Sequence, residues 1–85
     1  MQYRIELKNS VLKDIRRIPQ GMLLRIREAI ESLAENPLPT KSKKIQGYDD
    51  YYRIRIGQYR VVYHIGKKIR IITIIKIGHR KDVYK

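Results

Sequence analysis

The chain has 85 residues, with 20 Lys and Arg against 8 Asp and Glu and a formal net charge of +12. This length suits one small domain over residues 1–85, which buries only about 60–65% of the surface that its unfolded chain exposes. With no cysteine and two histidines, a disulfide framework and thiolate metal sites are excluded, and we expect neither a metal nor a cofactor.

The distribution of apolar residues gives no sign of a membrane segment. Charges at Arg4, Glu6 and Lys8 interrupt the first ten residues, which therefore lack the apolar core of a signal peptide. The most apolar run, Ile69 to Ile77, has nine residues and two charges, too few residues to cross a bilayer. We expect a cytoplasmic protein with no membrane partner.

The positive charge is concentrated in the second half of the chain. Residues 1–40 hold seven Lys and Arg against five Asp and Glu, whereas residues 41–85 hold thirteen against three. This asymmetry predicts a polyanionic partner for the second half. A generic solubilising surface is the plainer alternative, but such surfaces mix both signs. A membrane-surface role would need a basic amphipathic helix, and the basic excess lies in strand-like sequence instead.

The first half predicts one strand and two helices. Alternating apolar and polar residues predict a strand over about residues 2–8. We expect Asn9 or Ser10 to cap a short helix that ends before Pro19. A second helix is predicted from Gln20 to Glu35, with one apolar stripe made of Leu23, Ile26, Ile30 and Leu33.

From residue 41 onward the apolar pattern has a period of two. It predicts four strands, near residues 42–46, Tyr51–Ile56, Tyr59–Ile65 and Ile69–Ile77. The last is apolar on both faces, which favours an interior position in the sheet. We therefore predict a compact α+β domain in which two antiparallel helices pack on one face of a small, mostly antiparallel, twisted sheet.

The most informative segment is the hairpin "YYRIRIGQYRVVY". A two-residue type II′ turn at Gly57-Gln58 would pair Ile56 with Tyr59, Arg55 with Arg60 and Ile54 with Val61. Alternation then places Arg53, Arg55 and Arg60 on one face, and on the other face a core set of Tyr52, Ile54, Ile56, Tyr59 and Val61.

Two arginines directly opposite each other in a sheet repel and destabilise it. The pattern is reasonable if an anion normally lies between them, because guanidinium groups bind phosphate oxygens in a bidentate manner and stay charged at any working pH. The alternative is a solvated strand face that happens to carry three arginines.

The C-terminal segment "IGHRKDVYK" adds further candidates. If Gly78 ends the last strand, then His79, Arg80 and Tyr84 lie just past the sheet edge and can fold back beside the arginines. Histidine titrates near neutral pH, and tyrosine can stack on a base or carry a proton. A lone histidine is more often structural, and a terminal tyrosine is often a packing lid.

The order of elements, together with "YYRIRIGQYRVVYHI" and "IKIGHRKDVYK", resembles the RelE/ParE superfamily of toxins from bacterial and archaeal toxin–antitoxin systems. The resemblance covers essentially the whole chain. It implies a metal-independent endoribonuclease that cleaves mRNA, in many members within the ribosomal A site. It implies functional roles for Arg53, Arg55, Arg60, Arg80 and Tyr84. We therefore expect the catalytic residues to be Arg60, Arg80, Tyr84 and His79, and the residues that bind RNA phosphates to be Arg53, Arg55, Lys43 and Lys44.

The resemblance also implies partners and alternatives. The best-known member has lysines where this chain has Arg53 and Arg55, and arginine is a poorer general base but a good electrostatic clamp. The expected partners are a RelB-like antitoxin, mRNA and the ribosome, with DNA contacted only through the antitoxin. Two alternatives stay open: a ParE-like inhibitor of DNA gyrase and a non-catalytic nucleic-acid-binding module.

Overall fold

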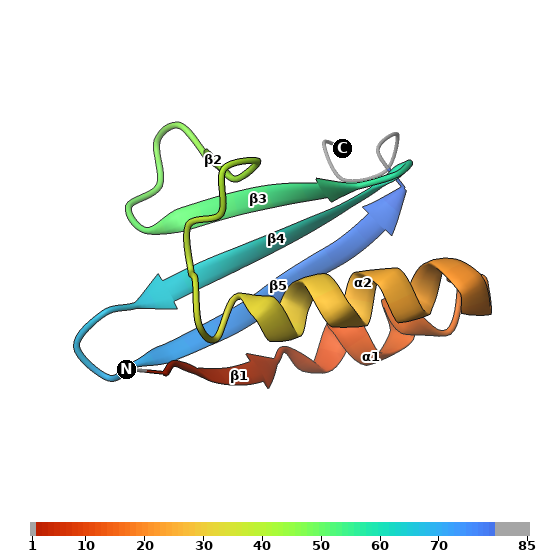
Figure 1. Ribbon diagram of the computed structural model, residues 1–85, viewed down its shortest axis with the longest axis horizontal. Helices are drawn as coiled ribbons and strands as arrows, with labels where there is room; N and C mark the ends of the chain where they lie inside the picture. The colour runs from red at the N-terminus through yellow and green to blue at the C-terminus, as the bar shows by residue number, and fades with distance from the viewer. Residues whose placement is uncertain (1, 80–85) are drawn as a thin grey trace.

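The computed structural model describes residues 2–79 and contains five strands and two helices (Figure 1). In chain order these are β1 (Arg4–Leu7), α1 (Asn9–Ile15), α2 (Gln20–Ser32), β2 (Lys43–Lys44), β3 (Tyr51–Ile56), β4 (Tyr59–Gly66) and β5 (Ile71–His79). The strands form one sheet in the order β1-β5-β4-β3-β2, in which only β1 and β5 are parallel. The predicted α+β fold and the interior position of the last strand are confirmed.

The helices differ from the prediction mainly at their ends. The predicted side-chain cap from Asn9 or Ser10 is wrong, because α1 already includes both residues and its N-cap is Lys8, whose carbonyl accepts from the Val11 N–H at 2.9 Å. Both helices end about three residues early in tighter turns, where N–H groups such as those of Ile18 and Leu33 bond to the carbonyl three residues before them. In the part of the chain that the structure describes, no helix is long and apolar enough to span a membrane.

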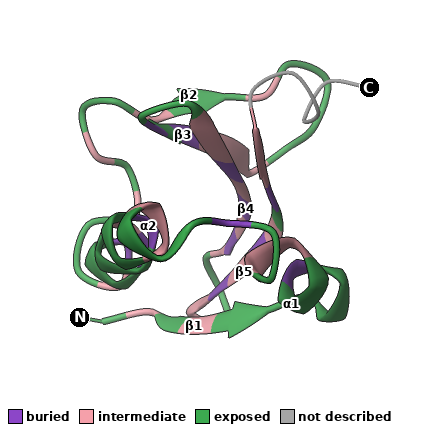
Figure 2. Cartoon of the chain, turned by 90° about the vertical axis from the view of Figure 1, so that its right-hand side faces the viewer, coloured by how far each residue is buried: buried purple, intermediate pink, exposed green. Residues whose placement is uncertain are grey.

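The core lies between the sheet and the helices. Four side chains of the central strands have no exposed surface, namely Val61 and Tyr63 from β4 and Ile72 and Ile74 from β5. Ile26 and Ile30 of α2 pack against this face, and Figure 2 shows buried segments, in purple, on the central strands and on the helices. The core face predicted for the hairpin is confirmed, with Ile54, Ile56 and Val61 buried and Tyr52 and Tyr59 packed against them.

Helix α1 continues along β5 where β1 stops. After Leu7, the Lys8 N–H still bonds to the Ile74 carbonyl at 3.0 Å. Further along, the Asp14 carboxylate accepts a hydrogen bond from the Ile77 N–H at 3.1 Å. Because a strand edge otherwise presents unpaired N–H groups, Asp14 substitutes for a neighbouring strand at this position.

Strand β5 contains an irregularity that changes which side chains face the helices. The register shifts between Val62 and Tyr63, which leaves Ile75 without a partner on β4. Strict alternation from Ile72 and Ile74 would turn residues 76 and 78 inward, whereas the extra residue turns Ile77 and His79 inward instead. The strand begins at Ile71 and ends at His79, two residues later at each end than predicted.

Candidate functional site

The face of the sheet away from the core gathers the predicted basic residues. The register places Lys43 beside Arg53, Arg53 beside Val62 and Val62 beside Lys76. The next row consists of Arg55, Arg60 and Gly78. We call this surface the basic face, made of Lys43, Arg53, Arg55, Arg60 and Lys76. The predicted pairing of Arg55 with Arg60 is confirmed.

The turn that creates this pairing has the predicted geometry. Gly57 has a φ of 59°, whereas Gln58 is not among the positive-φ residues of the described chain. A positive φ at the first central position alone is the feature of a type II′ turn. The glycine therefore sets the register that brings the two arginines together.

An open hollow of about 570 Å³ lies on the basic face. Its lining is mostly basic and consists of Lys43, Lys44, Ile45, Gln46, Arg53 and Arg60. Four of the predicted site residues therefore line one concave surface. Arg55 lies next to it, opposite Arg60, with its side chain exposed and its Nε donating to the Gly57 carbonyl at 3.4 Å.

The electrostatics of this region are one-sided. Strands β3, β4 and β5 contain no aspartate or glutamate. Several acidic side chains are engaged elsewhere, Glu6 with Arg4, Glu31 with Arg27 and Asp50 with Lys67. Because fixed positive charges attract anions, the basic face is suited to phosphate groups.

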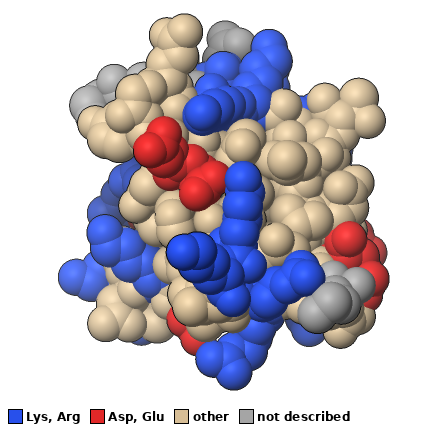
Figure 3. Space-filling model, turned by 90° about the vertical axis from the view of Figure 1, so that its left-hand side faces the viewer, with Lys and Arg blue, Asp and Glu red and all other residues tan. Residues whose placement is uncertain are grey.

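Further basic side chains lie at one end of the molecule. Figure 3 shows the left-hand side of Figure 1, where Lys and Arg side chains gather near the centre and acidic side chains form smaller groups. The turn between β4 and β5 lies at this end and contributes Lys67, Lys68 and Arg70 to the sequence. The positive charge of the described chain is therefore not confined to the hollow.

His79 does not lie where the sequence placed it. It belongs to β5 and pairs with Tyr59, so it faces the helix side, and its ring centre lies 5.7 Å from that of Tyr59 in an edge-on contact. The expectation that Gly78 ends the strand and that His79 folds back beside the arginines is wrong, because the extra residue at Ile75 reverses the alternation. The predicted residues Arg80 and Tyr84 lie outside the described residues.

Sequence reasoning missed an aromatic cluster beside the basic face. Tyr51 and His64 are paired across β3 and β4, with ring centres 4.7 Å apart, and Tyr48 lies edge-on to Tyr51 at 6.0 Å. The alternation that placed Arg53 and Arg55 outward also places Tyr51 outward. That signal was present in the sequence, but Tyr48 lies in a loop and no periodicity locates it.

One tyrosine is clearly structural. Tyr63 is fully buried and donates its hydroxyl hydrogen to the Pro37 carbonyl at 2.7 Å. Burial raises the pKa of Tyr63 to about 12, and the nearby Tyr52 contributes to the rise, while a hydrogen bond with Ser42 opposes it. Its hydroxyl therefore stays protonated and ties the segment after α2 to the sheet. Among residues 2–79, no group of three or more His, Asp or Glu side chains is placed to hold a metal ion.

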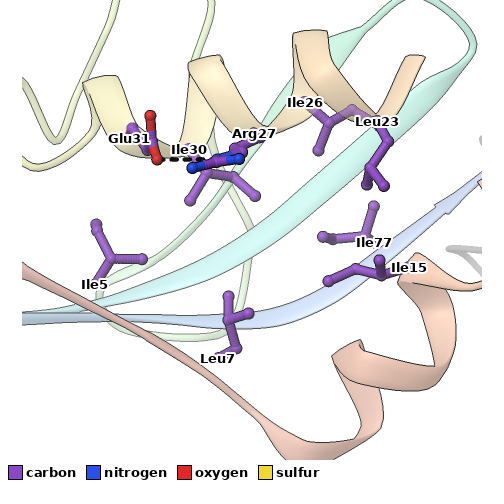
Figure 4. A pocket seen from close by; sticks show the side chains of 9 residues that line it. All are labelled: Ile5, Leu7, Ile15, Leu23, Ile26, Arg27, Ile30, Glu31 and Ile77. Carbon is purple, nitrogen blue, oxygen red and sulfur yellow. Dashed lines mark hydrogen bonds and ion pairs between the residues drawn. The ribbon is translucent and has the colours of Figure 1, made fainter. Parts of the chain in front are cut away.

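A second hollow, of about 420 Å³, is apolar and lies between β1, α1, α2 and β5 (Figure 4). Its lining is mostly leucine and isoleucine, namely Ile5, Leu7, Ile15, Leu23, Ile26, Ile30 and Ile77. The only charged side chains among those drawn, Arg27 and Glu31, form an ion pair of 3.2 Å on α2. This hollow can bind apolar side chains, but it has few groups for acid–base chemistry.

The geometry agrees with comparisons to known proteins. Residues 5–84 match the family model described as the ParE toxin of the type II toxin-antitoxin system parDE. The chain is 40% identical to the candidate toxin RelE1 of Methanocaldococcus jannaschii, over 100% of this chain and 98% of that protein. This chain belongs to the RelE/ParE superfamily of toxins.

Other superfamily members agree in sequence and fold. Toxin RelE3 of Methanocaldococcus jannaschii is 37% identical over 95% of this chain and 94% of its own length. A solved RelE–RelB complex from Pyrococcus horikoshii contains a chain 31% identical to this RelE/ParE toxin, with a TM-score of 0.84. The match covers 98% of this chain and 100% of that chain. The whole arrangement of sheet and helices is therefore shared.

Proposed function

We propose that this toxin is a metal-independent endoribonuclease that cleaves mRNA in the ribosomal A site. The observation that carries the proposal is the pairing of Arg55 with Arg60 on a sheet face whose main strands contain no acidic residue. A hollow lined by Lys43, Lys44, Arg53 and Arg60 lies on this face. Like charges directly opposite each other repel, and a bound anion relieves this repulsion. The resemblance to RelE-type toxins favours RNA as that anion.

The proposed reaction needs no metal. The ribose 2′-oxygen loses its proton and forms a bond to the adjacent phosphorus, while the bond from phosphorus to the 5′-oxygen of the next nucleotide breaks. The products are a 2′,3′-cyclic phosphate and a 5′-hydroxyl, which receives a proton. The largest contribution expected from the protein is stabilisation of the charge on the phosphorane, since one preorganised donor contributes about 3–4 kcal/mol.

The site residues divide into those that bind charge and those that move protons. Arg60 and Arg80 are proposed to hold the scissile phosphate, and the other basic residues to hold its neighbours, namely Arg53, Arg55, Lys43 and Lys44. Because arginine stays protonated, these arginines act as electrostatic clamps and not as bases. We assign proton transfer to Tyr84 ahead of His79, since the ring of His79 contacts Tyr59 on the opposite side of the sheet.

The proposed protein partner is a RelB-like antitoxin. The structurally similar Pyrococcus horikoshii RelE is in complex with RelB. A disordered acidic segment that folds on this toxin would mask the basic face and block RNA. Contact with DNA is proposed only through the antitoxin.

A second candidate function is inhibition of DNA gyrase, the activity of the ParE branch of the superfamily. The matching family model carries the ParE description, which favours this candidate. The combined presence of Arg53, Arg55, Arg60, Arg80 and Tyr84 in the sequence favours the nuclease. A non-catalytic nucleic-acid-binding module would need only the charge.

Translating ribosomes incubated with the purified toxin distinguish these functions. We expect new mRNA 5′ ends within A-site codons, and a loss of about 10²–10³-fold in cleavage rate for Arg60→Ala with an unchanged fold. Arg27→Ala, which removes one arginine from α2, should cleave normally. Full cleavage by Arg60→Ala would refute the nuclease proposal. Gyrase-dependent DNA breaks would support inhibition of DNA gyrase. RNA binding without cleavage would support a non-catalytic nucleic-acid-binding module.

A further inference from the structure

We propose that Tyr48, Tyr51 and His64 form a stacking subsite for one RNA base, next to the phosphates held by the basic face. This inference rests on the proposed ribonuclease function and adds how a nucleotide is positioned. The three rings form a continuous aromatic surface, since Tyr51 contacts His64 with ring centres 4.7 Å apart and Tyr48 with ring centres 6.0 Å apart.

The aromatic surface adjoins the basic face directly. Tyr51 precedes Arg53 by two residues in β3, so both side chains lie on the same side of the sheet, about 6.6–6.8 Å apart along the strand. Val62 pairs with Arg53 and also lines a hollow of about 280 Å³ with Ile45, Tyr48 and Tyr51. Ile45 lines the basic hollow as well. The two hollows are therefore neighbouring parts of one surface.

These rings are not needed for the core. Tyr48 is 62% exposed, Tyr51 and His64 are half-buried, and none belongs to the buried cluster. Proteins that bind single-stranded nucleic acid combine a basic groove with aromatic side chains on which bases stack. The size of the hollow is just below the range of about 300–1,000 Å³ typical of pockets for drug-sized ligands, which suits a single base.

The charges near the rings favour a base over a phosphate at this position. Asp49 follows Tyr48 directly, and its carboxylate would repel a phosphate. Asp50 pairs with Lys67 at 3.3 Å. A neutral base can therefore lie on the rings while its phosphate lies towards Arg53.

Binding of cleavage-resistant RNA tests the subsite. The probe is a short single-stranded RNA whose 2′-hydroxyls are all methylated, together with a series in which one nucleotide at a time is abasic. We expect Tyr51→Leu and Tyr48→Leu to weaken binding of the intact probe by about 5- to 150-fold, because a stacked base contributes about 1–3 kcal/mol. Tyr51→Phe and Tyr48→Phe keep the rings and should bind like the unsubstituted toxin.

The abasic series separates stacking from a general loss of structure. At one position of the series, the unsubstituted toxin should lose affinity and the Tyr51→Leu variant should lose nothing further. The subsite is overturned if Tyr51→Leu loses as much affinity as the unsubstituted toxin at every abasic position. It is also overturned if Tyr51→Leu binds the intact probe normally. If the Leu variants bind the antitoxin more weakly but bind RNA normally, the rings form a protein-docking surface, and the proposed stacking subsite is again overturned.

The failure of the subsite is distinguishable from failure of the proposed function. If Arg60→Ala abolishes ribosomal cleavage while Tyr51→Leu binds the probe normally, the nuclease proposal stands and the subsite is wrong. If the unsubstituted toxin neither cleaves on ribosomes nor binds the probe, both are wrong. Melting curves of the exposed-site variant Tyr48→Leu confirm that the chain tested is folded.

Discussion

Removing one member of the central arginine pair should stabilise the free toxin. Arg55 and Arg60 lie directly opposite each other on β3 and β4. Arg55→Gln keeps much of the side-chain length but removes the charge. We expect a higher free energy of unfolding at low salt, together with weaker RNA binding, because the repulsion is relieved and one phosphate contact is lost.

The magnitude follows from the position of the pair. Like charges about 5–7 Å apart in a solvent-like dielectric repel by roughly 0.6–0.8 kcal/mol. Cross-strand pair effects of about 0.2–1 kcal/mol lead to the same range. The hydrogen bond from Arg55 to the Gly57 carbonyl is long, at 3.4 Å, and exposed, so its loss costs little. A gain of about 0.5 kcal/mol corresponds to roughly 2–4 °C in Tm for a domain of this size.

Urea unfolding at 20 mM and at 1 M NaCl provides the measurement. At 1 M salt the screening length falls to about 3 Å, so the gain of Arg55→Gln should largely disappear. Arg55→Lys keeps the charge and serves as the matched control, with no gain expected at either salt concentration. A stability loss in Arg55→Gln at low salt, or a gain that salt does not change, would refute the repulsion argument.

Two further predictions concern hydrogen bonds that hold the sheet. The pKa of Tyr63 is raised from 10.0 to about 12, so the stability that it contributes is complete below pH 10 and is lost as the pH rises through 12. Urea unfolding should therefore show that the native chain exceeds Tyr63→Phe in free energy of unfolding by less and less over this window. A difference that stays constant with pH would contradict the prediction. Asp14→Ala should lower the free energy of unfolding by about 1–3 kcal/mol by removing the acceptor of the Ile77 N–H, whereas Asp14→Asn, which keeps an acceptor oxygen, should lose less.

The hairpin was predictable because its determinants are local. Gly57 supplies the positive φ of the turn, and the turn sets the register of the adjoining strands. From that register, alternation alone places Arg53, Arg55 and Arg60 on one face and Ile54 on the other. The basic face therefore needed no knowledge of distant contacts.

Features that depend on distant contacts were not predictable in the same way. The start of α1 uses the Lys8 carbonyl, not a side-chain cap, because Lys8 is still bonded to β5 through its own N–H. The loop that carries Tyr48 has no periodicity, so its position beside Tyr51 follows only from the folded sheet. Local sequence signals cannot report either arrangement.

The irregularity at Ile75 links the fold to the site. It turns His79 towards the helices and places Gly78 opposite Arg60 on the basic face. Because glycine has no side chain, the row that begins with Arg55 and Arg60 ends at a residue that adds no third side chain. A strand that alternated regularly would place an isoleucine, Ile77, beside the arginines. The same extra residue that turns the histidine towards the helices therefore places a glycine, and not an isoleucine, beside Arg60.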